Sequence, residues 1–180
     1  MITTTIGIIG RICSGKSTIA ERISNHFDIP IISFGAYLIQ YSKDNNLPID
    51  RDSLQNLGNS FIKENSREFL QNVIMSQPIT PDSMIIEGIR HLSIQKELAD
   101  ISNKSFFIFV ESSVENRYNR YRDRKKESDE IVSYEEFIAI DNHVVESEIE
   151  ALRAKCQLII NTNSEFDEDL FTQVAAFLKQ

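Results

Sequence analysis

Five short apolar runs are spaced along the chain, and helical patterns separate them. The runs lack the strict alternation of a half-exposed strand, which is typical of strands that are covered on both faces in a parallel sheet. They cover Thr3–Ile9, Pro30–Ser33, Ser83–Ile86, Ser105–Val110 and Leu158–Ile160. Because strands that alternate with helices favour right-handed crossovers, we predict a three-layer α/β fold with a five-stranded parallel sheet.

The segments between these runs carry apolar residues at helical spacing. A spacing of four predicts a first helix over Gly15–His26. Two longer helical patterns, separated by Pro48, cover Phe34–Asn45 and Arg51–Ser76. A last helix is predicted near the C-terminus, where the apolar positions are Phe166, Leu170, Val174, Phe177 and Leu178.

The composition favours one domain over residues 1–180, since 41% of the 180 residues are hydrophobic, enough for a single core. No apolar run approaches the roughly 20 residues of a membrane helix, and no targeting segment is recognised. We therefore expect a cytoplasmic protein with no membrane partner. The formal net charge of -8 argues against a nucleic-acid partner. The two cysteines are too few for a disulfide framework.

A glycine-rich segment stands directly between the first strand and the first helix. It matches the pattern GxxxxGK[ST] of a P-loop, in the strand and helix context that this motif requires. The predicted nucleotide-binding residues are Gly10, Arg11, Ile12, Cys13, Ser14, Gly15, Lys16, Ser17 and Thr18. This motif predicts that the protein binds ATP or a related triphosphate together with Mg²⁺.

The chemistry of phosphate binding gives several of these residues a role. Gly10 and Gly15 allow backbone torsions that let successive N–H groups surround the phosphates. Lys16 is expected to reach the β and γ phosphates, at the N-terminus of a helix whose dipole favours an anion. Ser17 is expected to ligate Mg²⁺, because hard cations take oxygen ligands. Thr18 is expected to pack or to cap the helix.

The order of motifs resembles the nucleoside monophosphate kinase family, including adenylate and cytidylate kinases and the related dephospho-coenzyme A kinases. The P-loop is followed by Ser33-Phe34-Gly35 after the second strand, by Glu87-Gly88-Ile89-Arg90 after the third, and by Arg120 to Arg124 after the fourth. The resemblance covers the whole chain. It implies a P-loop kinase fold with a helical acceptor-binding arm at about residues 34–77 and a short lid at about residues 120–145.

The resemblance also implies roles for residues outside the P-loop. Glu87 would lie near Mg²⁺, and Arg90 would grip the acceptor phosphate with a planar fork of donors. Arg120 and Arg124, four residues apart on one helical face, would act on the nucleotide from the lid. The catalytic residues are thus predicted to be Lys16, Arg90, Arg120 and Arg124, and the acceptor-binding residues Ser33, Gly35, Arg51 and Arg90.

The sequence departs from the family in the acceptor arm and the lid. Ala36 and Ile39 stand where family members carry an acidic residue and an arginine, and His143 is the candidate replacement for a lid arginine. The aromatic residues Tyr37, Tyr41 and Phe61 fit two roles, stacking on a base or packing in the core. The segment Asn161 to Asn163 falls where the resemblance implies a loop at the adenine edge.

These features predict transfer of the γ-phosphoryl group from ATP to a small phosphate-bearing acceptor, a nucleoside or deoxynucleoside monophosphate. A dephospho-coenzyme A kinase is an alternative, although such enzymes place an acidic residue after the second strand, where this chain has Ser33-Phe34-Gly35. A nucleotide-binding regulatory module with little turnover is the alternative outside the enzymes, and the missing arginines support it.

Overall fold

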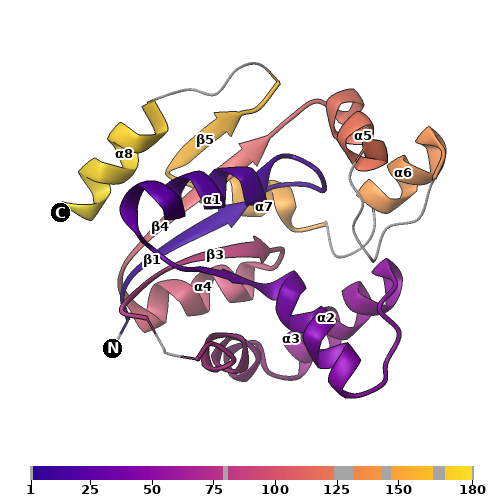
Figure 1. The fold of residues 1–180 in the computed structure, drawn as a ribbon, viewed down its shortest axis with the longest axis horizontal. Coiled ribbons are helices and arrows are strands. Elements are labelled where there is room, and N and C mark those ends of the chain that lie inside the picture. Colours follow the sequence, from indigo (N-terminus) through magenta and orange to yellow (C-terminus); the bar gives the residue numbers. More distant parts are fainter. Residues whose placement is uncertain (1, 79–80, 124–131, 143–146, 164–168, 180) are drawn as a thin grey trace.

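A computed structural model describes residues 2–78, 81–123, 132–142, 147–163 and 169–179. Within these ranges, five parallel strands form one sheet in the order β2-β3-β1-β4-β5 (Figure 1). The strands are β1 (Ile2–Ile9), β2 (Ile31–Ser33), β3 (Ser83–Ile89), β4 (Ser102–Glu111) and β5 (Leu158–Asn161). The predicted fold class, a three-layer α/β fold around a five-stranded parallel sheet, is confirmed.

Helices cover both faces of this sheet (Figure 1). Helices α1 and α8 share one core cluster with the sheet, whereas α2, α3, α4 and α7 share the other. The helices are α1 (Lys16–Phe27), α2 (Phe34–Asp44), α3 (Arg51–Met75), α4 (Leu92–Ile101), α5 (Val114–Asp123), α6 (Tyr134–Asp141), α7 (Ile149–Arg153) and α8 (Asp169–Leu178). In the described part of the chain, no helix combines the length and apolarity that a membrane crossing requires.

Strand β3 is longer than the apolar run that predicted it. The run ends at Ile86, but the strand continues to Ile89 because Glu87 still pairs with β1 and β2. Glu87 therefore lies inside the strand, and the prediction that it follows the strand end is corrected. Backbone pairing with β1 and β2 keeps Glu87 in the sheet. The apolar pattern alone indicated that the strand ends before this charged residue.

A β-bulge at Gly88 interrupts the pairing of β3 with β1. Ile8 pairs with Glu87 and Ile9 with Ile89, so Gly88 is the extra residue. Its φ of 90° lies in the left-handed region, which a glycine adopts at little cost. The bulge redirects the chain between Glu87 and Arg90, at the end of the sheet where the P-loop also begins.

The predicted arm between β2 and β3 consists of α2 and α3. Ser33 caps α2 by accepting from the Ala36 N–H, and Asp50 caps α3 by accepting from the Ser53 N–H. The predicted helix Arg51–Ser76 has nearly the observed extent, but its backbone leaves helical geometry at Asn65.

The break at Asn65 divides α3 into two segments. Its φ of -160° and ψ of 95° are extended, and its Oδ1 accepts from the Glu68 N–H at 3.1 Å. An asparagine side chain that bonds to the backbone three residues later is typical of a helix start. The sequence contained this signal, but the surrounding helical pattern obscured it.

Aromatic rings join the two helices of the arm. The ring centroids of Tyr41 and Phe61 lie 5.1 Å apart, those of Phe61 and Phe69 5.3 Å, and those of Tyr37 and Phe69 5.9 Å. Such distances are typical of packed aromatic pairs. Of the two roles open for Tyr37, Tyr41 and Phe61, packing in the core is therefore the one that their surroundings favour.

Candidate functional site

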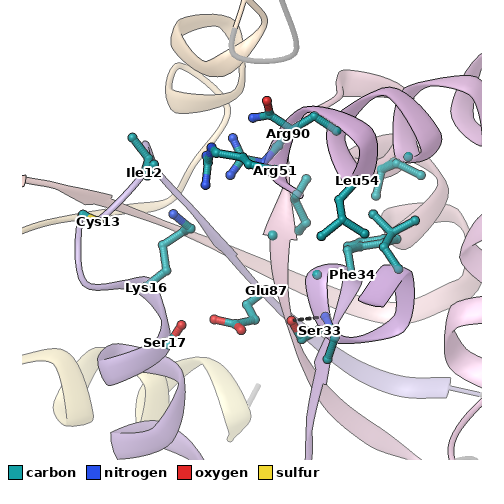
Figure 2. Close-up of a pocket in the computed structure, with 18 of the residues that line it drawn as sticks. Ile12, Cys13, Lys16, Ser17, Ser33, Phe34, Arg51, Leu54, Glu87 and Arg90 are labelled. Atoms are coloured by element: carbon teal, nitrogen blue, oxygen red, sulfur yellow. Dashed lines mark hydrogen bonds between the residues drawn. The ribbon is translucent and has the colours of Figure 1, made fainter. Parts of the chain in front are cut away.

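A cavity of about 1000 Å³ opens at the carboxyl ends of the strands. This is the edge where open α/β sheets bind ligands. One wall consists of the P-loop and α1, and the opposite wall consists of α2, α3 and the end of β3 (Figure 2). The predicted site residues that line it are Ile12, Cys13, Gly15, Lys16, Ser17, Thr18, Ser33, Gly35, Arg51, Glu87, Arg90 and Arg120. The fold thus brings together side chains from distant parts of the sequence.

The P-loop has the backbone shape of a phosphate-binding nest. Gly10, Cys13 and Gly15 have φ values of 151°, 58° and 96°. A β-carbon on Gly10 would lie 2.2 Å from the carbonyl oxygen of Val110, so a larger residue cannot stand there without moving β4. Cys13 adopts a left-handed conformation unusual for a residue with a β-carbon, and it is buried in a small apolar cluster. The cysteine side chain therefore has a packing role.

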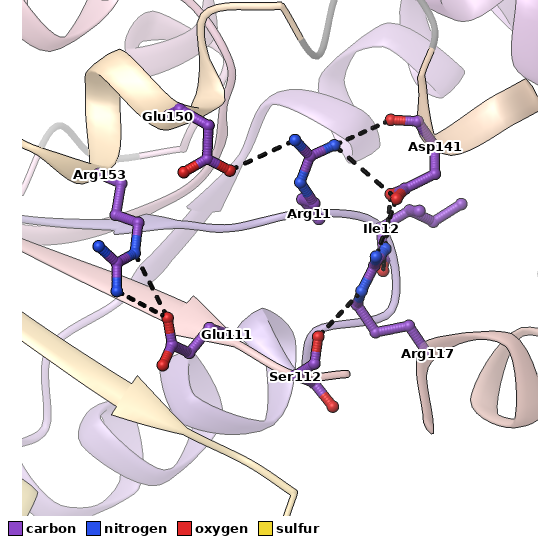
Figure 3. Close-up of polar contacts among 8 residues, drawn as sticks. All are labelled: Arg11, Ile12, Glu111, Ser112, Arg117, Asp141, Glu150 and Arg153. Carbon is purple, nitrogen blue, oxygen red and sulfur yellow. Dashed lines mark hydrogen bonds and ion pairs between the residues drawn. The ribbon is translucent and has the colours of Figure 1, made fainter. Parts of the chain in front are cut away.

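Three predicted nucleotide-binding residues, Gly10, Arg11 and Ser14, do not line the cavity. The Arg11 side chain extends to the other side of the loop, where it donates to the carbonyl oxygen of Asp141 at 3.1 Å and to Glu150 at 3.3 Å (Figure 3). The Arg11 side chain therefore packs outside the cavity, and the prediction that Arg11 binds the nucleotide as part of the loop stays a prediction for its backbone. The P-loop motif specifies no residue at this position, so the position is available for packing of the loop itself.

The side chains of Lys16, Ser17 and Glu87 line the cavity beside the P-loop. Figure 2 shows their side chains directed into the same space. The Lys16 ammonium donates to the carbonyl oxygen of Arg11 at 2.7 Å, which holds it against the loop. Ser17 and Glu87 supply a hydroxyl and a carboxylate, the oxygen ligands that Mg²⁺ accepts beside water and phosphate oxygens.

The donor set suits a metal that is shared with the nucleotide. Among the described residues, no group of three or more His, Cys, Asp and Glu side chains is gathered as a metal cluster. A cation at Ser17 and Glu87 would therefore need phosphate and water oxygens to complete its coordination. This fits Mg²⁺, which is usually held by one or two protein groups and substrate phosphates.

The wall opposite the P-loop combines two arginines with an apolar surface. Arg51 begins α3 and Arg90 follows β3, and both line the same cavity as Lys16 (Figure 2). Apolar residues continue this wall, namely Phe34, Leu38, Ile39, Leu54, Ile62 and Phe69. Ile39 stands where members of the nucleoside monophosphate kinase family carry an arginine, and here it extends the apolar surface.

Arg120 is held by a hydrogen-bond network that the sequence did not indicate. Its guanidinium donates to the Thr162 hydroxyl at 3.0 Å, to the Thr162 carbonyl oxygen at 2.5 Å and to the Cys13 carbonyl oxygen at 3.4 Å. The Thr162 hydroxyl in turn donates to the carbonyl oxygen of Ser14 at 2.8 Å. Thr162 therefore links the P-loop to α5.

The other predicted lid residues lie outside the described residues, namely Arg124 and the candidate replacement His143. The expected loop at the adenine edge is described. Asn161 and Thr162 line the cavity, whereas Asn163 accepts from the Ser112 hydroxyl and the Ser113 N–H and so joins the ends of β4 and β5.

Three residues near the site have structural roles that the sequence did not predict. Thr162 has just been described, and Arg117 and Asp141 form a buried ion pair behind the P-loop. Arg117 belongs to a basic segment that runs from Arg117 to Lys126. No local spacing relates Arg117 to Asp141, so only the packing of α5 against α6 could reveal the pair.

Solved structures show the same fold. A search of curated proteins found no match. TT1252 from Thermus thermophilus is 20% identical, with 99% of this chain and 98% of the other covered and a TM-score of 0.64. A shikimate kinase from Bacteroides thetaiotaomicron is 13% identical, with 98% of this chain and 99% of the other covered and a TM-score of 0.64. A gluconokinase from Sinorhizobium meliloti 1021 is 14% identical, with 99% of this chain and 93% of the other covered and a TM-score of 0.59.

At these identities, the likeness shows a fold shared with P-loop kinases, and it does not establish membership of the nucleoside monophosphate kinases. A family model described as AAA domain matches residues 6–153. The match begins within β1 and extends through the P-loop to the end of α7. Because it covers most of the 180 residues, the chain belongs to the AAA domain family.

Proposed function

We propose that this chain is an ATP- and Mg²⁺-dependent phosphotransferase whose acceptor is a nucleoside or deoxynucleoside monophosphate. The observation that carries the proposal is the pairing of two walls in one cavity. The P-loop wall presents Lys16 and Ser17, and the opposite wall presents Arg51 and Arg90. A site that holds two phosphate groups face to face is what direct transfer between nucleotides needs.

The P-loop wall supports binding of the ATP phosphates. Its backbone N–H groups and the N-terminus of α1 favour an anion, and Lys16 adds a positive charge next to them. Bound Mg²⁺ would neutralise charge on the β and γ phosphate oxygens, with Ser17 and Glu87 as its protein partners. Lys16 and Arg120 would stabilise the charge that spreads over the transferred group.

The acceptor wall supports a molecule with an anionic group and a flat, weakly polar body. Arg51 and Arg90 suit a phosphate, because a guanidinium offers a planar fork of donors. The neighbouring apolar surface of Leu38, Ile39 and Leu54 suits a base, since burying the hydroxyls of a sugar against it would leave them without partners. Such a surface favours a nucleotide over a polyhydroxylated acid.

No covalent enzyme intermediate is required for this reaction. A phosphate oxygen of the acceptor is already nucleophilic, and the walls need only align it with the γ-phosphoryl group. Closing the cavity would exclude water, which otherwise competes as an acceptor. The chain's own residues therefore act by positioning and by charge.

A hydroxyl acceptor is the second candidate, and one observation favours it. Ser33, at the end of β2, pairs in register with Glu87 on β3. A carboxylate thus lies beside the position where dephospho-coenzyme A kinases carry an acidic residue. A carboxylate within hydrogen-bond reach of an acceptor hydroxyl can take its proton. The named shikimate kinase and gluconokinase are relatives in fold.

A transfer assay separates these candidates. The protein is incubated with ATP and Mg²⁺ and, in turn, with each ribonucleoside and deoxyribonucleoside monophosphate, dephospho-coenzyme A, shikimate and gluconate, and products are identified by mass. We expect one monophosphate to yield its diphosphate, and we expect Lys16→Ala to abolish that product. Phosphorylation of a hydroxyl compound alone would replace the proposal with the second candidate. Tight ATP binding without any product would favour a regulatory module.

A further inference from the structure

A network of charged residues, Arg11, Arg117, Asp141 and Glu150, contacts the P-loop without lining the cavity (Figure 3). At its centre, Arg117 of α5 and Asp141 of α6 form a bidentate ion pair with N–O distances of 2.5 and 2.8 Å. The two residues are only 4% and 6% exposed. The pair therefore joins α5 to α6 at a point shielded from solvent.

Both partners of this pair also contact the P-loop. Arg117 donates to the carbonyl oxygen of Ile12 at 3.3 Å. Arg11 donates to the carbonyl oxygen of Asp141 at 3.1 Å, and its guanidinium lies 3.7 Å from the Asp141 carboxylate. Asp141 thus receives one arginine from the P-loop and one from α5. Two consecutive P-loop residues are held from outside the cavity.

Neither phosphate binding nor stability alone accounts for this arrangement. The P-loop motif leaves positions 11 and 12 unspecified, and the Arg11 side chain does not line the cavity. Removing two charges from water is costly, so a buried pair is weak evidence for net stabilisation, whereas its directed hydrogen bonds fix the geometry of what they contact. What they contact here is the backbone of the nucleotide-binding loop.

We propose that Asp141 is a positioning residue for the P-loop and acts through Arg117 and Arg11. The two arginines hold the loop in its binding shape, so that its N–H groups do not have to be ordered when the nucleotide arrives. The same contacts tie the loop to the base of the lid. The proposal rests on nucleotide binding at the P-loop, which is part of the proposed function, but not on transfer or on any acceptor.

The test measures MgATP affinity by titration calorimetry, without an acceptor and well below the melting temperature. Arg11→Met removes the link to the loop and leaves the Arg117–Asp141 pair intact. Asp141→Asn keeps the side-chain shape and removes the charge. Arg153→Met is the matched control, because Arg153 forms a separate ion pair with Glu111 at 3.0 Å nearby, with no hydrogen bond from it to the P-loop among the described residues (Figure 3).

We expect Arg11→Met to weaken MgATP binding about threefold, as for a partly exposed ion pair. Asp141→Asn is expected to weaken it at least about tenfold, because a buried charge loses its partner. Arg153→Met is expected to stay within about twofold of the unmodified protein, in keeping with an exposed pair. Restoring a cation with Arg11→Lys is expected to recover part of the loss.

Thermal melting without nucleotide separates positioning from a purely structural role. Arg11 is 27% exposed, so its replacement is expected to leave the melting temperature nearly unchanged while affinity falls. Unchanged affinity in Arg11→Met would overturn the proposal even if Asp141→Asn does not fold, and so would an equal loss in Arg153→Met. Absence of transfer with every acceptor would count against the proposed function alone, because the titration requires no acceptor.

Discussion

The two walls of the cavity are built in different ways. The P-loop wall comes mainly from one short segment, Ile12, Cys13 and Gly15 to Thr18, and its chemistry lies in backbone torsions and in Lys16 and Ser17. The acceptor wall draws on β2, α2, α3 and the end of β3, and its chemistry lies in side chains that meet only after folding. This contrast explains why a sequence motif predicts nucleotide binding, whereas the acceptor can be inferred only from side chains that pack together in the folded protein.

The walls also differ in how their residues are held. Lys16 is bonded to the loop itself, and Thr162 and Arg120 reinforce the loop with further hydrogen bonds. The acceptor wall is backed by apolar and aromatic packing around Phe69. Polar substitutions are therefore expected to act mainly on ATP at the first wall, and loss of an arginine mainly on the acceptor at the second.

The largest effect is expected for Lys16→Ala, which removes the charged side chain of the P-loop wall. Turnover should fall by about 10²- to 10³-fold, the usual loss when one group that stabilises transition-state charge is removed. Circular dichroism and thermal melting should match the unmodified protein, because the apolar face of α1 is unchanged. Near-normal turnover would remove the basis for the kinase proposal.

Arg90→Ala breaks the acceptor wall and leaves the P-loop wall intact. Losing a charged hydrogen-bond partner costs about 1.5 to 3 kcal/mol, so the acceptor KM should rise roughly 10- to 150-fold. The KM for ATP should change little. Arg67→Ala is the matched control, since Arg67 lies exposed on the same arm outside the cavity. Equal losses for ATP and acceptor would mean that the two walls are not separate.

Thr162→Val sharpens the comparison from the P-loop side. Valine keeps the shape but loses the hydroxyl that accepts from Arg120 and donates to the Ser14 carbonyl oxygen. Loss of one or both of these hydrogen bonds, at about 1 kcal/mol each, is expected to lower kcat/KM for ATP about five- to thirtyfold. Thr162→Ser, which retains the hydroxyl, should stay close to normal. Similar losses in both variants would show that the methyl group and not the hydroxyl matters.

The smallest effect is expected for Arg51→Ala, the second arginine of the acceptor wall. We expect the acceptor KM to rise by about three- to fivefold, because a single pair in a partly solvated position contributes up to about 1 kcal/mol. Steady-state kinetics with varied acceptor and saturating ATP measure this directly. A rise larger than that of Arg90→Ala would make Arg51 the main acceptor contact.

Several elements could be predicted because their signals are local. The P-loop, the strand before it and the helix after it are read from consecutive residues, and the helices of the arm are read from periodic spacing. The extension of β3 to Ile89 was missed because it depends on pairing with another strand. The break at Asn65 was missed because the helical pattern around it obscures the capping signal.

The sequence by itself determined the fold class, the nucleotide-binding loop and which charged residues were available to a ligand. Only the tertiary structure decided which of them share a cavity. It directed Arg11 away from the cavity toward Asp141, buried Arg117, and placed Thr162 between the P-loop and Arg120. The physical reason is that backbone conformation responds mainly to near neighbours in sequence, whereas an ion pair or a hydrogen bond between distant residues forms only when the whole core packs.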